Sequence, residues 1–407
     1  MKRYRLAVVA LTVSLILGAC GSSSTKSTAG STSAPTSVAG TTTCHFPRPT
    51  TIVNLAPQPG QDPLGDPGWV DGPQLAVDQV NSAGGICGQP VTLKQQNISS
   101  SSPTSDLTSF LAAVGESPSA IIGAGDASNI VVPLIPSIAK AGIPVVTLPD
   151  AAIEYLGKGT GSKALFPLSP DPTLSIQQWV QYAIDTYHPK KVGYVCVQSD
   201  VGDFSCQVGV AYLKSKGIQV VEEYNGPTAT DLTQQVLALK GVDVVFTTNY
   251  PSPGGVLLNQ LADNGINAPV VTVLVGAFIV AAGNPRASTI PNIQGDEQCA
   301  GQAPNASDPV AVQFRAAWQA AFGSPAVLYG PDSYSETEFV LKAIKIAASQ
   351  DPAKVTVAMG EVPQFDSPCG PMVLNKANNS ILSSIVVVNY DASTRAVKSI
   401  LKTIVIP

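Results

Sequence analysis

The sequence predicts an α/β protein in which parallel β-sheets are covered by helices. The prediction rests first on a recurring phrase, in which a helical run ends at Gly, an Ile or Val follows, and β-branched residues begin. Gly readily takes the left-handed conformation that ends a helix, and a short run of Val and Ile suits a strand buried on both faces. Repeated strand–helix units of this kind build parallel sheets. The copies of the phrase are Ala83–Ile86, Ala141–Val146, Lys216–Val221, Asn264–Ile266 and, as a variant, Lys240–Val245.

Length and composition agree with this class and exclude several others. The chain has 407 residues, of which 44% are hydrophobic and 13% charged, so it is not a disordered, charge-driven chain. A net charge of −5 argues against the basic surface of a nucleic-acid-binding protein. With only two histidines, His45 and His188, the sequence offers little support for histidine-based zinc sites or Ser-His-Asp catalysis.

The phrase and the apolar runs beside it place the individual elements. A helix over Pro73–Val80 would carry Leu75, Ala76 and Val80 on one face. The last apolar runs, Ile385–Tyr390 and Ala396–Ile406, flank a short polar segment and indicate an antiparallel hairpin. The expected strands are Thr51–Leu55, Val91–Gln96, Ala120–Gly123, Val145–Leu148, Lys191–Val197, Gln219–Tyr224, Val242–Thr247 and Val270–Leu274. The other expected helices are Ser175–Tyr187, Ser205–Lys216, Asp231–Leu239, Val256–Asp263, Val310–Phe322 and Tyr334–Ala348.

The strand–helix pattern breaks between Leu148 and Lys191. Within this interval Ala164–Pro172 is rich in proline, which fixes φ and disfavours helix at the preceding residue. The segment is therefore expected to be extended and to cross between two lobes.

The first residues have the pattern of an export signal. Basic Lys2, Arg3 and Arg5 precede a largely apolar stretch, Leu6–Ala19, whose 14 residues are fewer than the roughly 20 that span a bilayer. The end of this segment, Leu17–Cys20, resembles the bacterial lipobox, in which the cysteine is lipidated. The alternative is an ordinary signal peptide with a chance cysteine. We expect residues 1–19 to be the signal peptide, and residues 20–43, rich in Gly, Ser and Thr, to be lipidated Cys20 and a flexible tether.

Six further cysteines point to disulfides. An exported protein is in a compartment that favours them, although six cysteines can pair in many ways. The expected pairs are Cys44–Cys87, Cys196–Cys206 and Cys299–Cys369, of which the second is the most local. Metal binding is the alternative, but the sequence contains no CxxC motif and almost no histidine, so we expect no metal site.

A longer segment carries a family resemblance. Residues Leu75–Leu93, LAVDQVNSAGGICGQPVTL, resemble the first helix and second strand of type I periplasmic binding proteins of the branched-chain amino acid and amide branch. The resemblance continues through residues 120–150, Phe166 and residues 187–226, and more weakly through residues 329–348. It implies two Rossmann-like lobes with parallel sheets, joined by hinge strands, and a small solute bound in the cleft for an ABC importer. Residues 44–167 and 275–350 would form the N-terminal lobe, and residues 168–274 and 351–407 the C-terminal lobe.

Ligands of parallel sheets bind beyond the carboxyl ends of the strands. In the N-terminal lobe, Asp126 and Ser128 follow the expected strand Ala120–Gly123, and Asp150 and Ala151 follow Val145–Leu148. Ala151 stands where the family usually has a hydroxyl, and Asp126 would repel an anionic group. The alternative is that Asp126 or Ser128 caps a helix and that Asp150 is a solvated turn residue.

Aromatic and polar residues add to these candidates. Phe204 and Tyr250 follow C-terminal-lobe strands at positions where the resemblance implies aromatic residues of the cleft. Gln61 and Trp69 lie in the first loop and at the start of the first helix, where Trp69 would stack on a ligand. Phe204 and Trp69 are, alternatively, packing residues.

One absence bears on the ligand. Family members that bind amino acids tend to place an acid after the last strand of the C-terminal lobe, but residues 264–295 contain no Asp or Glu. A buried ammonium group without a partner costs several kcal/mol. An amino-acid ligand would therefore need Asp126, Asp150, Asp200 or Asp332 as its partner.

These observations together predict an extracytoplasmic solute-binding lipoprotein. We expect a monomer, anchored to the cell membrane by its lipid, that captures a small polar solute and docks on an ABC transporter permease without any cofactor. A ligand sensor for a membrane receptor is a second hypothesis. An extracellular hydrolase is a third, but no Gly-x-Ser-x-Gly motif has a suitable histidine after it.

Overall fold

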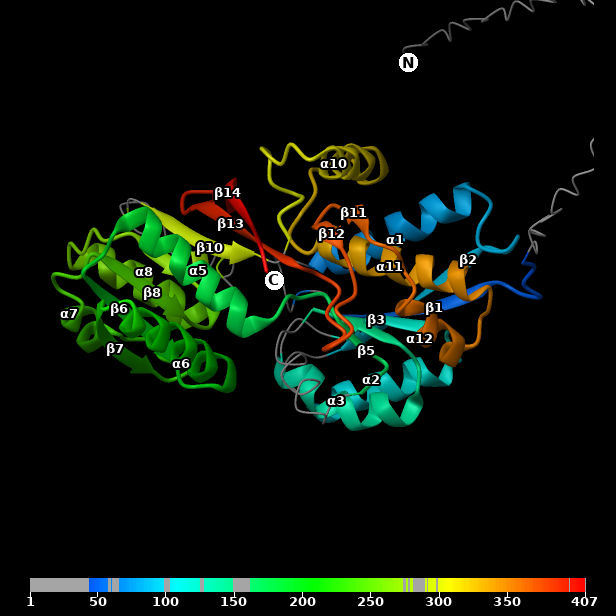
Figure 1. Ribbon diagram of the computed structural model, residues 1–407, viewed down its shortest axis with the longest axis horizontal. Coiled ribbons are helices and arrows are strands. Elements are labelled where there is room, and N and C mark those ends of the chain that lie inside the picture. Colours follow the sequence, from blue (N-terminus) through cyan, green and yellow to red (C-terminus); the bar gives the residue numbers. More distant parts are fainter. Residues whose placement is uncertain are drawn as a thin grey trace, which may run out of the picture. The chain divides into compact units, whose positions relative to one another are not determined.

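The computed structural model describes two large β-sheets, each with helices on both faces, and a small two-stranded sheet (Figure 1). The described residues are 44–57, 60, 66–98, 103–124, 128–148, 162–273, 276, 279–280, 290, 292–297, 299–394 and 396–406. Within these ranges no helix is both long enough and apolar enough to cross a membrane. The α/β class with mainly parallel sheets, predicted from the sequence, is confirmed.

The first sheet has five parallel strands in the order β2-β1-β3-β4-β5. Its strands are β1 (Thr50–Pro57), β2 (Val91–Ile98), β3 (Ala120–Gly123), β4 (Val145–Thr147) and β5 (Leu165–Pro167). Helices α2 (Pro103–Gly115) and α3 (Ser128–Ala141) cover one face, where Val53 and Ile121 are buried. Helices α1 (Asp66–Ser82), α11 (Gly330–Ala347) and α12 (Pro352–Met359) cover the other, over Ile52 and Ile122.

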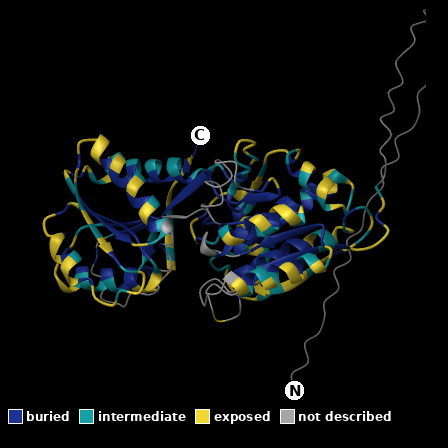
Figure 2. Ribbon diagram, turned by 90° about the horizontal axis from the view of Figure 1, so that it is seen from below, coloured by how far each residue is buried: buried dark blue, intermediate teal, exposed yellow. Residues whose placement is uncertain are grey.

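The second sheet has seven strands in the order β14-β13-β10-β9-β8-β6-β7. The parallel part comprises β6 (Lys191–Val197), β7 (Gln219–Asn225), β8 (Val244–Thr248), β9 (Val270–Thr272) and β10 (Ile293–Glu297). Strands β13 (Ser384–Asp391) and β14 (Ala396–Val405) form the antiparallel hairpin that the sequence predicted, and β13 joins the sheet antiparallel to β10. The helices around this sheet are α5 (Pro172–Tyr187), α6 (Asp200–Ser215), α7 (Thr233–Ala238) and α8 (Pro251–Asp263). In Figure 2 the strands of both sheets are buried and the outer faces of the helices are exposed.

The glycines of the recurring phrase do end helices. Gly142, Gly217 and Gly265 have φ values of +65°, +76° and +67°, in the left-handed region that side chains with a Cβ rarely adopt. Each is followed by the strand that the phrase predicted. This local chemistry is why the sequence located most of the parallel strands.

The structure assigns two segments differently from the boundaries expected at residues 275 and 350. Strand β10 pairs with β9 and β13 and thus belongs to the second sheet. Helix α12 packs on α11, and its Val355 and Met359 are buried in the core beside the first sheet. The small hairpin of β11 (Phe365–Ser367) and β12 (Gly370–Met372) contributes to the same core. Short elements carry too little periodicity to show which sheet they join.

Three disulfides are present: Cys44–Cys87, Cys196–Cys206 and Cys299–Cys369. They are the pairs expected from the sequence. The first joins the segment before β1 to the turn after α1, and the second joins β6 to α6. The third is buried and joins the segment after β10 to the turn between β11 and β12.

Helices α1 and α11 approach each other more closely than side chains would normally allow. A Cβ at Gly68 would lie 2.0 Å from the carbonyl oxygen of Leu328, and a Cβ at Gly72 would lie 2.1 Å from Ser333 Oγ. Ser333 Oγ also donates a hydrogen bond to the carbonyl of Gly68 at 2.7 Å. The start of α11 is thus held against the start of α1, although the two are far apart in the sequence.

Filling this contact should loosen the fold. We expect Gly72→Ala to lower the free energy of unfolding by about 1–3 kcal/mol, because the added methyl group must displace Ser333 and the carbonyl of Gly330. Gly115→Ala, at a helix end with no neighbouring atom within 4 Å, is the matched control and should leave stability unchanged or slightly raised. Urea titrations followed by circular dichroism compare the two. Equal stability of Gly72→Ala and the wild type would contradict the close contact.

Candidate ligand-binding site

The carboxyl ends of the parallel strands define the candidate site in each sheet. In the first sheet these ends are Pro57, Gly123 and Thr147, followed by α1 and α3 at their amino termini. In the second sheet β6 leads into α6, and β8 leads into α8. Helix amino termini present backbone N–H groups that have no partner within the helix. Polar ligand groups find hydrogen-bond donors at such edges.

The candidate residues divide into two groups. Trp69, Phe204 and Tyr250 have described side chains. Ser128 is the first residue of α3, but its side chain is not among the described ones, and the same holds for Asp200 at the start of α6. Gln61, Asp126, Asp150, Ala151 and the lipidation candidate Cys20 lie outside the described residues.

Trp69 lies in the first turn of α1 and is fully buried. Its ring centre is 4.6 Å from that of Tyr329, and the two planes are inclined by 35°. The Asn54 amide donates a 2.7 Å hydrogen bond to the Trp69 carbonyl and so fixes this turn to the end of β1. The structure therefore places the indole in the core, packed against Tyr329, and its contact with a ligand stays a prediction.

In the second sheet, two amide side chains hold the site edge in place. Asn225 ends β7 and Asn249 directly follows β8, and their amides exchange hydrogen bonds of 3.1 and 2.8 Å. Both side chains are buried. Tyr250 comes next, at the cap of α8, and is half-buried. The pair fixes the backbone that presents the Tyr250 ring.

Phe204 lies on the neighbouring element, in α6, and is half-buried against the core that also contains Cys206. Strands β6 and β8 are adjacent, with Cys196 paired to Thr248, so that the segments carrying Phe204 and Tyr250 follow neighbouring strand ends. Ser205 Oγ lies 2.7 Å from Thr248 Oγ1 and fastens α6 to β8. This edge thus combines aromatic rings with uncharged polar groups.

The structure adds an acidic feature to the first sheet, on α11. Asp332 and Glu336 are both fully buried and stand one helical turn apart. Burial raises the pKa of Asp332 to about 7. Burial, and secondarily the Asp332 carboxyl, raise the pKa of Glu336 well above its usual value, while the backbone of Gly123 acts in the opposite direction. Asp332 is among the candidates from the sequence, but Glu336 is not. The spacing of four residues, which places both acids on one helix face, could have indicated Glu336 as well.

Asp332 also lies beside the buried disulfide. An Asp332 carboxylate oxygen and the sulfurs of Cys299 and Cys369 lie within 4.8 Å of one another, the one such group of metal-ligand types found among the described residues. Both sulfurs are bonded to each other. A disulfide sulfur is not a thiolate and is a poor metal ligand, so the arrangement does not support a metal site.

Basic residues are missing from the described parts of the two edges. Of the described residues that directly follow the strand ends and begin the next helices, none is Lys or Arg. Acids do occur in the described first turns of these helices, among them Asp106 and Asp203. The described edges are therefore neutral to acidic.

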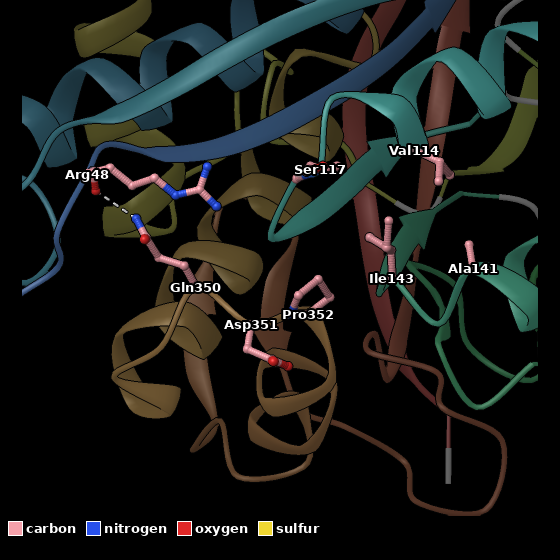
Figure 3. Close-up of a pocket in the computed structure, with 9 residues that line it drawn as sticks. Arg48, Val114, Ser117, Ala141, Ile143, Gln350, Asp351 and Pro352 are labelled. Atoms are coloured by element: carbon pink, nitrogen blue, oxygen red, sulfur yellow. Dashed lines mark hydrogen bonds between the residues drawn. The ribbon is translucent and has the colours of Figure 1, made fainter.

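A depression on the described surface lies elsewhere. Its volume is about 490 Å³, and it is lined by residues that precede strands, among them Arg48, Ser117 and Ile143, together with Gln350 and Asp351 (Figure 3). The Gln350 amide donates a hydrogen bond to the carbonyl of Arg48 at 2.7 Å. These residues lie at the amino ends of β1, β3 and β4, the edge opposite to the candidate site. We do not assign the solute to this depression.

Comparison with known proteins agrees with this geometry. The family model described as "Periplasmic binding protein" matches residues 49–395. A "Leu/Ile/Val-binding protein homolog 8" of Brucella abortus is 26% identical over 328 residues, covering 76% of this chain and 79% of the relative. The "Leu/Ile/Val-binding protein BraC3" of Rhizobium johnstonii is 27% identical over 204 residues. That match covers 49% of this chain and only 54% of the relative, about half its length.

Solved structures share the fold at lower sequence identity. The branched-chain amino acid transporter substrate binding protein LivJ of Streptococcus pneumoniae, in complex with isoleucine, superposes with a TM-score of 0.73 at 19% identity, covering 88% of this chain and 100% of that chain. A fatty acid ABC transporter substrate-binding protein of Thermomonospora curvata has the same TM-score of 0.73 at 16% identity, covering 88% and 92%.

The fold and the family match define the class: a binding protein with two α/β lobes of the type I periplasmic kind. The chain belongs to the periplasmic binding protein family, whose members work outside the cytoplasm.

The two buried acids should make the stability of the fold depend on pH. Because burial raises both pKa values, the folded chain holds these protons more tightly than the unfolded chain. Below about pH 4 the two acids are protonated in the folded and in the unfolded chain, and they do not lower the free energy of unfolding. As the pH rises from the unfolded to the folded pKa values, the unfolded chain loses these protons first, and the free energy of unfolding falls. We expect the melting temperature to fall between about pH 5 and pH 8.

Calorimetric melts of variants test this assignment. Asp332→Asn and Glu336→Gln should each reduce the fall in melting temperature. Glu338→Gln is the control, since Glu338 lies on the same helix but is partly exposed and pairs with Lys342 at 3.1 Å; it should keep the wild-type slope. Identical slopes in all four proteins would show that the acids do not hold their protons.

Proposed function

We propose that this chain is the solute-binding protein of an ABC importer and captures a small polar solute by closing its lobes. The observation that carries the proposal is the path of the chain, which passes three times between the two sheets: after β5, after β10 and after β12. Multiple crossings form a hinge, about which lobes can close on a ligand. The family membership supports the same mechanism.

The chemistry of the described edges favours an uncharged or nitrogen-bearing solute of amino-acid or amide type. The rings of Phe204 and Tyr250 offer apolar surface and a phenol hydroxyl but no positive charge, and the mutually paired amides of Asn225 and Asn249 hold this edge in place. The names of the curated relatives, Leu/Ile/Val-binding proteins, support an amino-acid solute. A protein of the same fold is a fatty acid transporter substrate-binding protein, so the fold alone does not specify an amino-acid solute, and a direct binding test is needed.

A screen of small solutes tests this function. A solute that binds only the folded chain should stabilise it by about 2.7 kcal/mol at a concentration one hundred times the Kd. We expect such a shift for at least one of the common amino acids or their amides, and mass spectrometry of the purified protein should detect a copurified solute of the same class. The absence of any shift across amino acids, amides and small acids would contradict the proposal.

The role of Tyr250 follows from its place at the site edge. Tyr250→Ala should weaken binding of the solute that the screen identifies by about tenfold, the usual effect of losing an aromatic contact. Tyr212→Ala is the control, because Tyr212 lies on α6 where its hydroxyl bonds Gln181 at 2.9 Å. It should lower stability without changing affinity. Unchanged affinity in Tyr250→Ala would remove this residue from the site.

We also propose that the protein is a lipoprotein, lipidated at Cys20. Acyl chains contribute about 0.8 kcal/mol per buried CH₂, enough for several chains to anchor a protein firmly. Expressed in a bacterium, the wild type should fractionate with membranes and carry the added acyl mass, whereas Cys20→Ser should lose both. Ser22→Ala serves as the control and should behave as the wild type. Membrane association of Cys20→Ser would contradict lipidation.

A further inference from the structure

Glu336 is an acid without an evident structural reason to be buried. Its side chain has no solvent exposure, no described side chain pairs with either carboxyl oxygen, and the one group near enough to act on them as a donor is the backbone of Gly123. Buried polar groups in native proteins nearly always have partners, because an unpaired one costs several kcal/mol. An exception of this kind calls for a functional explanation.

The neighbouring polar side chains on α11 sharpen the contrast. Ser333 donates to the carbonyl of Gly68 at 2.7 Å, Ser335 to that of Pro331 at 2.7 Å, and Thr337 to that of Ser333 at 2.6 Å. Each of these hydroxyls uses a backbone carbonyl within its reach. Glu336, between them in sequence, does not take part in this pattern.

The carboxyl of Glu336 lies next to the carboxyl end of β3. The backbone of Gly123, the last residue of that strand, is near enough to favour the ionised form of Glu336. Strand β3 is flanked by β1 and β4, so the acid lies under the centre of the first sheet's binding edge. A Cβ at Gly123 would lie 3.0 Å from Asn54 Oδ1, and Asn54 in turn holds Trp69.

The charge of this position restricts what binds there. The amino terminus of α3 would favour an anion by its free N–H groups. A carboxyl group beneath the same edge opposes an anion when it is ionised, and the described edge residues include no Lys or Arg to offset it. Its oxygens can instead accept hydrogen bonds from a solute N–H, and this would satisfy the buried group.

We propose that Glu336 is a specificity-determining residue, whose carboxyl accepts a hydrogen bond from an amine or amide nitrogen of the solute at the end of β3. The inference rests on the proposed solute-binding function and names the chemical group that the first lobe selects. When the group is an ammonium, Glu336 releases its proton to solvent and pairs with the cation as a carboxylate. When it is an amide, the acid stays neutral and accepts the N–H. Asp332, one turn earlier on the same helix, is the neighbouring acid that acts on Glu336.

The experiment compares probes with and without the nitrogen. L-leucine and 4-methylpentanoate differ in the amine alone, whereas leucinamide and 3-methylbutylamine keep the amine and lack the carboxylate. Calorimetry measures the binding of each probe to the wild type, to Glu336→Gln and to Glu336→Leu. The twenty amino acids, their amides, benzoate and short fatty acids are tested separately as further probes. Glu338→Gln is the matched control on the same helix.

We expect the wild type to prefer the nitrogen-bearing probes. Glu336→Gln should weaken the ammonium probes by about tenfold or more, the range for a hydrogen bond to a charged group, and Glu336→Leu should weaken every N–H probe. Affinity for 4-methylpentanoate should not fall in either variant. Calorimetry in buffers of different ionisation heat should show proton release on binding an ammonium probe, absent in both variants. A merely structural role would weaken all probes alike and leave proton release unchanged.

Two results would overturn the inference while the proposed function stands. One is nitrogen-dependent binding that is unchanged in both Glu336 variants, and the other is binding of nitrogen-free acids in preference to amines. Failure of the wild type to bind any probe would instead contradict the proposed function itself. Melting curves of Glu336→Gln, whose side chain has nearly the same size, show whether a loss of affinity reflects misfolding.

Discussion

The close contact between α1 and α11 is the constraint on which the first lobe depends. Two glycines, Gly68 and Gly72, let the helices touch through backbone atoms, and Ser333 fastens them with a hydrogen bond. The residues joined in this way are more than 250 positions apart in the sequence, since Ser333 and Gly68 differ by 265. The contact brings α11, from the late part of the chain, over the sheet formed by the early part. It therefore decides which side chains lie beneath the binding edge.

The consequences of this contact reach the chemistry of the edge. It packs Trp69 against Tyr329 and brings the second turn of α11, with Glu336, next to Gly123. In the second lobe, shorter-range links hold the strand ends and the following helices together. These links are the Cys196–Cys206 disulfide, the Ser205–Thr248 hydrogen bond and the paired amides of Asn225 and Asn249. One edge is thus built by a long-range helix contact and the other by short-range links.

Much of the fold followed from the sequence because its signals are local. A glycine that ends a helix and a β-branched run that follows it need no tertiary information, and Gly142 and Gly217 adopt the conformation this requires. The assignment of β10 and α12 to a lobe depends on distant partners, which short segments do not encode visibly. Glu336 was missed for a similar reason. Its burial results from the packing of α11, whereas its sequence neighbours, polar and acidic, indicate an exposed turn.

The candidate site shows the same division between local and distant information. Loop residues such as Asp126, Asp150 and Ala151 were chosen because they follow strands, a rule that holds for any parallel sheet. That rule treats all strand ends alike and does not say which charge the site contains. A buried acid comes from a helix that packs beneath the edge, and its ionised form can only be stabilised by a donor or a cation. Under the role proposed for Glu336, the sign of the selected solute group is set by α11, an element that the loop-based rule does not consider.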